Sequence, residues 1–272
     1  MADVAAACCA QFYELDYVQL FLGDSFHPGG LPLSRRLVSG LELPLGARVL
    51  DVACGTGTTA VMVAKDLGAR VTGLDFSEKN ITRARERATK QRVMDQMEFT
   101  SGAADALPYE DGTFHAVVCE CAVSTFVDKA AAAQQFARVL APGGMLCVSD
   151  MAAERVLPAD LVERAGRWTC VADALSGAGY VQLFAAAGLT LVEHVDERDA
   201  LLRLVSDLKR KLLLAGVGQL TGTMPGMNLD LMEIKNLLND AKAVVESGAL
   251  TYGRWVFSKG APRYFQPVAV AS

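Results

Sequence analysis

The stretch that most constrains the fold of this chain runs from Val49 to Leu67. Apolar and β-branched residues stop at Gly55-Thr56-Gly57, and an apolar helical pattern follows. This order places a glycine turn at the carboxyl end of a buried strand, where open α/β sheets hold their ligands. Glycines let the backbone approach a ligand closely, and the helix offers its amino end to negative charge. The spacing G-x-G lacks the Lys-Ser/Thr of a phosphate-binding P-loop, and many such turns carry glycines for steric reasons only.

The rest of the chain alternates strand-like and helix-like patterns. This alternation predicts a parallel sheet with helices on both faces and right-handed crossovers. We expect helices between the strands, including one at 78–91 with Ser77 as its N-cap, and a helical stretch over 154–187. Strands are expected at 48–52, 70–74, 97–101, 116–121, 145–150, 189–194 and 250–257.

The pattern also predicts the domain organisation. Residues 1–46 form an N-terminal helical lid over the mouth of the sheet, and 47–198 form the core. Residues 199–248 form a helical cap insertion with helices at 199–217 and 229–247, because a sheet needs no fifty-residue connection. A final strand segment follows at 249–260. The tail, 261–272, is expected to be loosely held.

Composition excludes several classes of protein. The chain has 272 residues, half of them hydrophobic, so it can bury a sizeable core, and its net charge is −5. No cluster of Lys and Arg indicates nucleic-acid binding, and no apolar run reaches membrane-spanning length. The start of the chain lacks the features of a signal peptide, and seven irregularly spaced cysteines indicate reduced thiols. We therefore predict a cytoplasmic protein with no nucleic-acid or membrane partner and no metal site; a homodimer stays open.

Four segments carry a family resemblance: VLDVACGTGTTA at 49–60, VTGLDFSEKNITRAR at 71–85, GAADALPYEDGTFHAVVCE at 102–120 and FARVLAPGGMLCVSD at 136–150. In order and spacing they resemble the class I S-adenosylmethionine-dependent methyltransferases. A nicotinamide-binding Rossmann domain shares the first turn but does not predict the last two segments. The resemblance implies an α/β, Rossmann-like, doubly wound sheet of seven mostly parallel strands. It also implies an antiparallel last strand, a helical cap and S-adenosyl-L-methionine as cofactor.

The resemblance assigns the methionine half of the cofactor to the first turn. The backbone at Ala53, Gly55 and Gly57 would lie against it, and Asp51 would attract its ammonium group. A bulky side chain at Gly55 or Gly57 is expected to block the site. Cys54, inside the turn, is interpreted as a small packing residue.

The adenosine half is assigned to the next two strand ends. Asp75 would accept hydrogen bonds from both ribose hydroxyls, which suits a carboxylate. Phe76 would lie against the adenine face, and Asp105 would accept from the adenine amine beside the backbone of Ala104. Cys119, near the end of the strand that borders the transferred methyl group, is also placed at the cofactor.

Two cysteines suggest one kind of methyl acceptor. If the fourth strand persists that far, alternation puts Cys119 and Cys121 on one side and Glu120 on the other. Cys121 followed by Asp128-Lys129, with Cys170 further on, is similar to arsenite methyltransferases. By that resemblance Cys121 and Cys170 would ligate a soft As(III) centre, which thiolates suit. The family's usual cysteine stretch before the first turn is absent, and the alternative is that both are small buried hydrophobic residues.

An organic acceptor is the other interpretation. The central segments also resemble the menaquinone and ubiquinone C-methyltransferases. In that case His27 and Glu120 would serve as general base for a quinone-like carbon, thiol, amine or hydroxyl. A third possibility is an inactive protein that binds the cofactor and a partner. Methyl transfer needs mainly alignment and exclusion of water, so we expect no catalytic triad.

Overall fold

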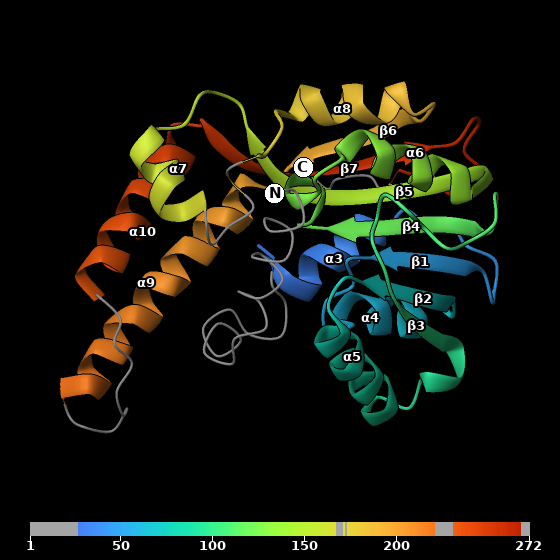
Figure 1. The fold of residues 1–272 in the computed structure, drawn as a ribbon, viewed down its shortest axis with the longest axis horizontal. Coiled ribbons are helices and arrows are strands. Elements are labelled where there is room, and N and C mark those ends of the chain that lie inside the picture. The colour runs from blue at the N-terminus through green and yellow to red at the C-terminus, as the bar shows by residue number, and fades with distance from the viewer. Residues whose placement is uncertain (1–26, 167–170, 172, 221–230, 268–272) are drawn as a thin grey trace.

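The computed structural model describes residues 27–166, 171, 173–220 and 231–267. They form one seven-stranded sheet flanked by helices, with strand order β3-β2-β1-β4-β5-β7-β6 (Figure 1). The strands are β1 (Arg48–Val52), β2 (Arg70–Asp75), β3 (Met97–Ser101), β4 (Phe114–Glu120), β5 (Leu140–Ala153), β6 (Thr190–Asp196) and β7 (Leu250–Ser258). The helices are α3 (Gly30–Val38), α4 (Thr58–Leu67), α5 (Glu78–Lys90), α6 (Lys129–Val139), α7 (Ala159–Gly166), α8 (Gly177–Ala186), α9 (Arg198–Leu220) and α10 (Leu231–Glu246), with short 3-10 turns η1 (Met94–Gln96) and η2 (Val123–Thr125).

The direction of the strands confirms the predicted fold class. β3, β2, β1, β4 and β5 pair in parallel, whereas β7 pairs antiparallel with both β5 and β6. The sheet is therefore doubly wound, and the strand order reverses direction between β1 and β4. Ligands of open α/β sheets bind at such a switch point, beyond the carboxyl ends of the strands.

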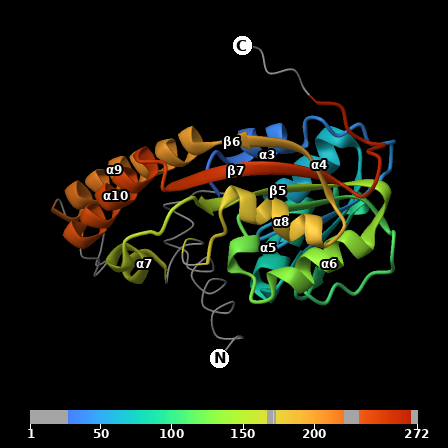
Figure 2. The ribbon, with the colours of Figure 1, turned by 90° about the horizontal axis from the view of Figure 1, so that it is seen from above.

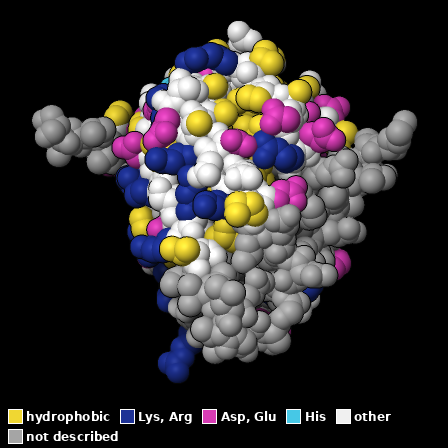
Figure 3. Space-filling model, turned by 90° about the vertical axis from the view of Figure 1, so that its left-hand side faces the viewer, with side chains coloured by type: hydrophobic (Ala, Val, Ile, Leu, Met, Phe, Trp, Pro, Cys, Tyr) yellow, Lys and Arg dark blue, Asp and Glu magenta, His cyan; other side chains and the backbone are white. Residues whose placement is uncertain are grey.

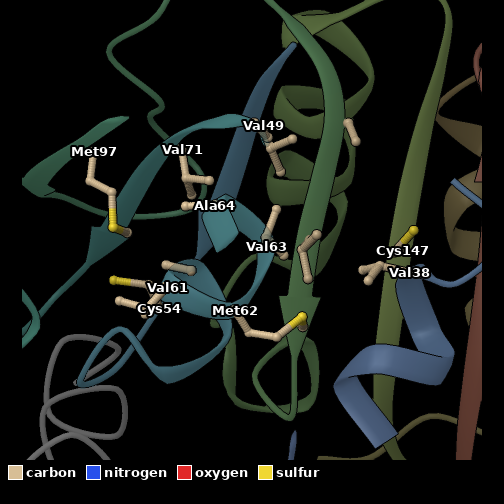
Figure 4. Close-up of a cluster of buried hydrophobic side chains, with 14 of the residues drawn as sticks. Val38, Val49, Cys54, Val61, Met62, Val63, Ala64, Val71, Met97 and Cys147 are labelled. Atoms are coloured by element: carbon tan, nitrogen blue, oxygen red, sulfur yellow. The ribbon is translucent and has the colours of Figure 1, made fainter. Parts of the chain in front are cut away.

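Helices cover both faces of the sheet. α3 and α4 lie on one side and α6 and α8 on the other (Figure 2). The first layer buries β-branched strand residues against small helical side chains, and Cys54 and Cys147 point into that cluster (Figure 4). Burial raises the pKa of both thiols, which therefore stay protonated as packing residues. The interpretation of Cys54 agrees with this placement.

Local sequence signals explain the predicted boundaries. The Ser77 side chain accepts from the backbone N–H of Asn80 and caps α5 as expected. α4 begins after Gly57, which has φ +74°. A Cβ at Gly57 would lie 2.9 Å from the Cβ of Ala84 on α5. Packing between α4 and α5 and backbone strain therefore disfavour a larger residue there, and the expected block of the ligand site stays a prediction.

The structure also differs from the sequence predictions, among other places, in the following segments. The stretch 154–187 contains two helices, α7 and α8, and the backbone N–H groups of Ala153 and Glu154 ahead of them donate to Leu175 and Ala249. α9 continues beyond the predicted end at 217 to Leu220. The tail is not loose over 264–266, since Leu41 and Phe265 form an antiparallel bridge that Glu42 and Gln266 extend.

The predicted lid and cap are only partly visible. Residues 1–26 of the expected lid lie outside the described residues, and α3 packs on the sheet face through Leu33, Leu37 and Val38. α9 and α10 lie side by side and extend away from the sheet (Figures 1 and 2). Seen from that side, charges of both signs are interspersed with apolar side chains (Figure 3). Within the described residues, no helix is long and apolar enough to cross a membrane.

Candidate functional site

Polar side chains gather where β1, β2, β4 and β5 end. Asp51 pairs in register with Gly73 and Val118, and Glu120 pairs with Ser149. The carboxyl ends of these parallel strands therefore meet at one edge, beside the switch between β1 and β4. This edge is the candidate site.

Two non-glycine residues adopt left-handed backbone at this edge. Ala53 has φ +57° just after β1, and Cys121 has φ +53° just after β4. Such conformations cost of order 1–3 kcal/mol each and cluster at functional sites. β4 thus ends at Glu120, and the prediction that strand alternation carries through Cys121 is wrong. Cys121 packs instead at the border of the cluster that contains Met151 and Tyr252.

Cys119 does not reach the site with its side chain. The thiol is fully buried in the hydrophobic layer on the α6 and α8 side of the sheet. Burial, followed by the charge of Asp150, raises its pKa well above the ordinary value. The thiol therefore lies on the opposite face from Glu120, and the placement of Cys119 at the cofactor stays a prediction that only its backbone can satisfy.

Asp51 has a buried carboxylate, one oxygen of which accepts no hydrogen bond from the described residues. It is 3% exposed, and its Oδ2 has no hydrogen-bond partner among the residues that the structure describes. Burial raises its pKa well above the ordinary aspartate value, and the negative charges of Glu120 and Asp75 raise it further. A buried acceptor in a negative field favours a ligand that brings N–H donors and positive charge. The ammonium and sulfonium groups of S-adenosylmethionine match this requirement.

Asp75 organises the glycine turn. Its Oδ2 accepts from the Gly55 backbone N–H at 2.8 Å, and its Oδ1 accepts from the Ser77 N–H and the Asn80 side chain. A carboxylate has about four acceptor positions, so ribose hydroxyls would share its oxygens with these donors. Asp75, which is predicted to bind the ribose, therefore also ties the end of β2 to the turn that follows β1.

The residues assigned to the adenine are at least partly exposed to solvent. Phe76 follows β2 and is 54% exposed, which is unusual for a phenylalanine beside a core strand. Asp105 is exposed and Ala104 half-buried in the loop after β3. All three are accessible to a ligand at the edge of the sheet.

His27 and Glu120 are brought together by a ring of side chains. His27 Nε2 lies 3.6 Å from Glu120 Oε2 and 3.2 Å from Ser34 Oγ. Thr59 Oγ1 is 3.3 Å from Ser34 Oγ and donates to Glu120 Oε1 at 2.8 Å. Both side chains of the pair are less than a tenth exposed. A histidine beside a fixed carboxylate can take up a proton, which makes this pair a candidate general base.

Sequence reasoning found His27 and Glu120 but missed the other members of the ring. Ser34 is on α3 and Thr59 is in the first turn of α4. Ser149 on β5 donates to Glu120 Oε2 at 3.1 Å, and its Oγ lies 3.0 Å from the Tyr252 hydroxyl. Hydroxyl residues inside helices and strands carry no local signal, although the position of Thr59 after the glycine turn places it at the same edge.

Asp150 fixes the loop beyond Cys121. Its two oxygens accept from the backbone N–H and hydroxyl of Ser124 and from the Met151 N–H. Burial raises the pKa of Asp150 to about 6, against the lowering effect of these donors and of Lys129. The η2 turn beside the site is therefore held by a carboxyl group that titrates near neutrality.

Asp150 gives the stability of the protein a distinct pH dependence. Because its folded pKa is raised, the folded state binds a proton between about pH 4 and pH 6 that the unfolded chain has released. The free energy of unfolding is therefore expected to fall as pH rises through this window, by at most about 3 kcal/mol. Urea unfolding of the wild type and of Asp150→Asn at several pH values measures it. Equal slopes in the two proteins over this window would contradict the assignment.

The cysteine pair is not tested by the structure. Cys170 lies outside the described residues, so its distance from Cys121 is not defined. Among the residues that the structure describes, no group of three or more His, Cys, Asp or Glu side chains is placed to hold a metal ion.

Comparisons with known proteins agree with this site. A family described as "Methyltransferase domain" matches residues 45–188. The 27-O-demethylrifamycin SV methyltransferase of Amycolatopsis mediterranei is 39% identical over 118 residues, 43% of each chain. The demethylmenaquinone methyltransferase of Lactiplantibacillus plantarum is 37% identical over 114 residues, 41% of this chain and 48% of that protein. These matches thus span less than half the length of either relative.

Solved structures show the same fold. Haemonchus contortus phosphoethanolamine N-methyltransferase 2, in complex with S-adenosyl-L-methionine, has a TM-score of 0.73 and 17% identity. The match covers 92% of this chain and 56% of that one.

Fold and site together define an α/β protein with a negatively charged ligand site at the switch point of its sheet. The chain belongs to the methyltransferase domain family, in its class I, S-adenosylmethionine-dependent form. The cofactor of this class is S-adenosylmethionine, as the sequence predicts.

Proposed function

We propose that the protein transfers a methyl group from S-adenosylmethionine to a hydroxyl or hydroquinone-type carbon of a small organic molecule. The observation that carries the proposal is the buried His27–Glu120 pair, held by Thr59 at the carboxyl edge. Asp51, whose carboxylate acts electrostatically with Glu120, belongs to the same edge. The named relatives act, by their titles, on an organic O-methyl site and on demethylmenaquinone.

The cofactor side of the site divides between three strand ends. The methionine part would lie along the backbone at Ala53 and Gly55, with its ammonium group at the unfilled Oδ2 of Asp51. Asp75 would receive the ribose hydroxyls, and Phe76, Ala104 and Asp105 would enclose the adenine. When bound, S-adenosylmethionine supplies an electrophilic methyl group.

On the acceptor side of the site, His27 and Glu120 would remove a proton from the acceptor. An acceptor hydroxyl near His27 Nε2 would give its proton to the imidazole as its oxygen, or a ring carbon that it activates, bonds to the methyl carbon. The bond from methyl to sulfur would break and S-adenosylhomocysteine would leave. A methylated ring carbon would then lose its own proton, and the ring oxygen would regain one. Nδ1 lies 3.1 Å from the Pro28 carbonyl oxygen and can donate to it, which leaves Nε2 free to accept. Glu120 then stabilises the imidazolium that results.

A soft metalloid held by Cys121 and Cys170 is the competing acceptor. The structure favours the organic acceptor, because Cys121 packs at the edge of an apolar cluster. We retain the division into lid, core and cap as part of the proposal, with α9 and α10 as the cap. A homodimer and a cytoplasmic location are likewise proposals.

Incubation with labelled S-adenosylmethionine and a panel of phenols, hydroquinones, thiols, amines and arsenite tests the proposal. We expect label in phenols or hydroquinones. Label only in arsenite, lost in Cys121→Ser, would replace the organic acceptor by the metalloid.

A further inference from the structure

We propose that the hydroxyls of Thr59, Ser149 and Tyr252 are positioning groups, which set the proton affinity of the His27–Glu120 pair. This inference rests on the proposed function. It adds three residues from three further elements, and each acts through Glu120.

The first argument is how the carboxylate is held. Thr59 donates to Oε1 at 2.8 Å and Ser149 donates to Oε2 at 3.1 Å, so each oxygen of Glu120 has its own hydroxyl donor. The donors come from α4 and β5, on either side of the strand that carries Glu120. This arrangement prevents the carboxylate from rotating and keeps Oε2 facing His27.

The second argument is the support behind Ser149. Its Oγ lies 3.0 Å from the Tyr252 hydroxyl on β7, and both side chains are fully buried. Burial, followed by electrostatic interaction with Cys121 and Glu120, raises the pKa of Tyr252 well above its ordinary value. Tyr252 therefore keeps its proton and can donate it to Ser149, whose own proton then points to Glu120. Hydrogen bonds in such a chain strengthen one another.

The direction of the effect follows from the states of the pair. Hydroxyl donors stabilise the Glu120 carboxylate whether or not His27 carries a proton. The stabilisation is greater when His27 is neutral, because the imidazolium competes with the hydroxyls for the same carboxylate. Removing a donor therefore raises the pH at which the pair takes up its proton. The pair then carries a proton, and cannot act as a base, up to a higher pH. The acid limb of the pH–rate profile therefore moves to higher pH.

Other titratable groups near Glu120 do not account for a shift of the acid limb between variants. They are Asp51, Cys119, Cys147 and Tyr252, and Asp150 lies near the last of these. Burial keeps the two thiols and the phenol protonated. Saturating cofactor fixes the charge at Asp51, and Asp150 is common to all the variants compared.

The experiment is the pH dependence of kcat/KM for the acceptor at saturating S-adenosylmethionine. In Ser149→Ala and Thr59→Val we expect the acid limb to move up by about 0.3 of a pH unit, a fraction of a hydrogen bond to a charged group, because each hydroxyl acts on His27 through Glu120. In Tyr252→Phe we expect about 0.1 of a unit, because the effect is one bond further removed. Thr59→Ser, which keeps the hydroxyl, restores the wild-type limb. Ser258→Ala is the matched control, a buried serine of β7 that donates to Gly260.

A second readout does not need turnover. With ¹³C-labelled glutamate and histidine, the pH at which the pair takes up its shared proton is followed by NMR, and it is expected to rise in Ser149→Ala and Thr59→Val. If both variants methylate the acceptor and their acid limb stays at the wild-type pH, the positioning role is overturned. The proposed function still stands in that case. If no acceptor is methylated, the proposed function fails, and the NMR shift alone decides whether the hydroxyls set the proton affinity.

Discussion

Asp51→Asn is expected to weaken S-adenosylmethionine binding and to stabilise the ligand-free protein at the same time. The loss of a charged hydrogen bond to the cofactor's ammonium group corresponds to about 10- to 100-fold in Kd. In the ligand-free state the same carboxylate is buried with Oδ2 unpaired and with Glu120 and Asp75 acting on it. Its folded pKa is raised, so the free energy of unfolding falls as pH rises above the ordinary aspartate range. The amide that replaces the carboxylate carries no charge, so a gain of about 1 kcal/mol at neutral pH is expected.

Calorimetry with the cofactor and urea unfolding without it measure the two effects. Asp66→Asn is the matched control, because Asp66 makes an exposed ion pair with Arg35 and lies in α4. That variant is expected to change neither quantity appreciably. Unchanged cofactor affinity in Asp51→Asn would remove Asp51 from the site.

Loss of the base is expected to reduce turnover strongly while cofactor binding persists. His27→Gln is expected to lower kcat by about 100- to 1000-fold, the usual range for a positioned acid–base group. Glu120→Gln is expected to lower it by about 10- to 100-fold, and the double variant no further than His27→Gln, since the two act as a unit. Steady-state kinetics with the best acceptor of the panel, together with calorimetry, separates turnover from binding.

His115→Gln provides the comparison for the loss of a histidine. His115 lies on β4 far from the carboxyl edge, where its Nδ1 accepts from the Arg48 backbone N–H. The turnover of this variant is expected to equal that of the wild type. Turnover within about threefold of wild type in His27→Gln would assign the ring a structural role only.

The elements around the first turn could be predicted because their signals are local. β1, α4 and β2 follow from short apolar runs bounded by glycines, and the cap of α5 follows from Ser77 alone. The acidic residues at the strand ends follow from the same pattern, because parallel strands deliver their ends to one edge. The family resemblance then predicted S-adenosylmethionine as the cofactor, and the family match confirms this prediction.

The hydroxyls around Glu120 could not be predicted because they meet over long distances in the chain. Thr59 is 61 residues from Glu120, and Tyr252 is 103 residues from Ser149. Left-handed backbone at Cys121 has no sequence signal either, since few residues other than glycine adopt it. Because of that turn, β4 ends one residue earlier than the sequence predicts. The ordered tail was missed because its pairing with Leu41 is equally remote.

The central claim is that a cation binds at the acidic carboxyl edge. Calorimetric titration of the wild type with S-adenosylmethionine, in two buffers with different ionisation enthalpies, tests it most directly. A cation beside Asp51 favours the ionised carboxylate, so one-site binding is expected to release a proton, and the number released is expected to fall as pH rises. Absence of binding, or binding that takes up protons instead, would contradict the account.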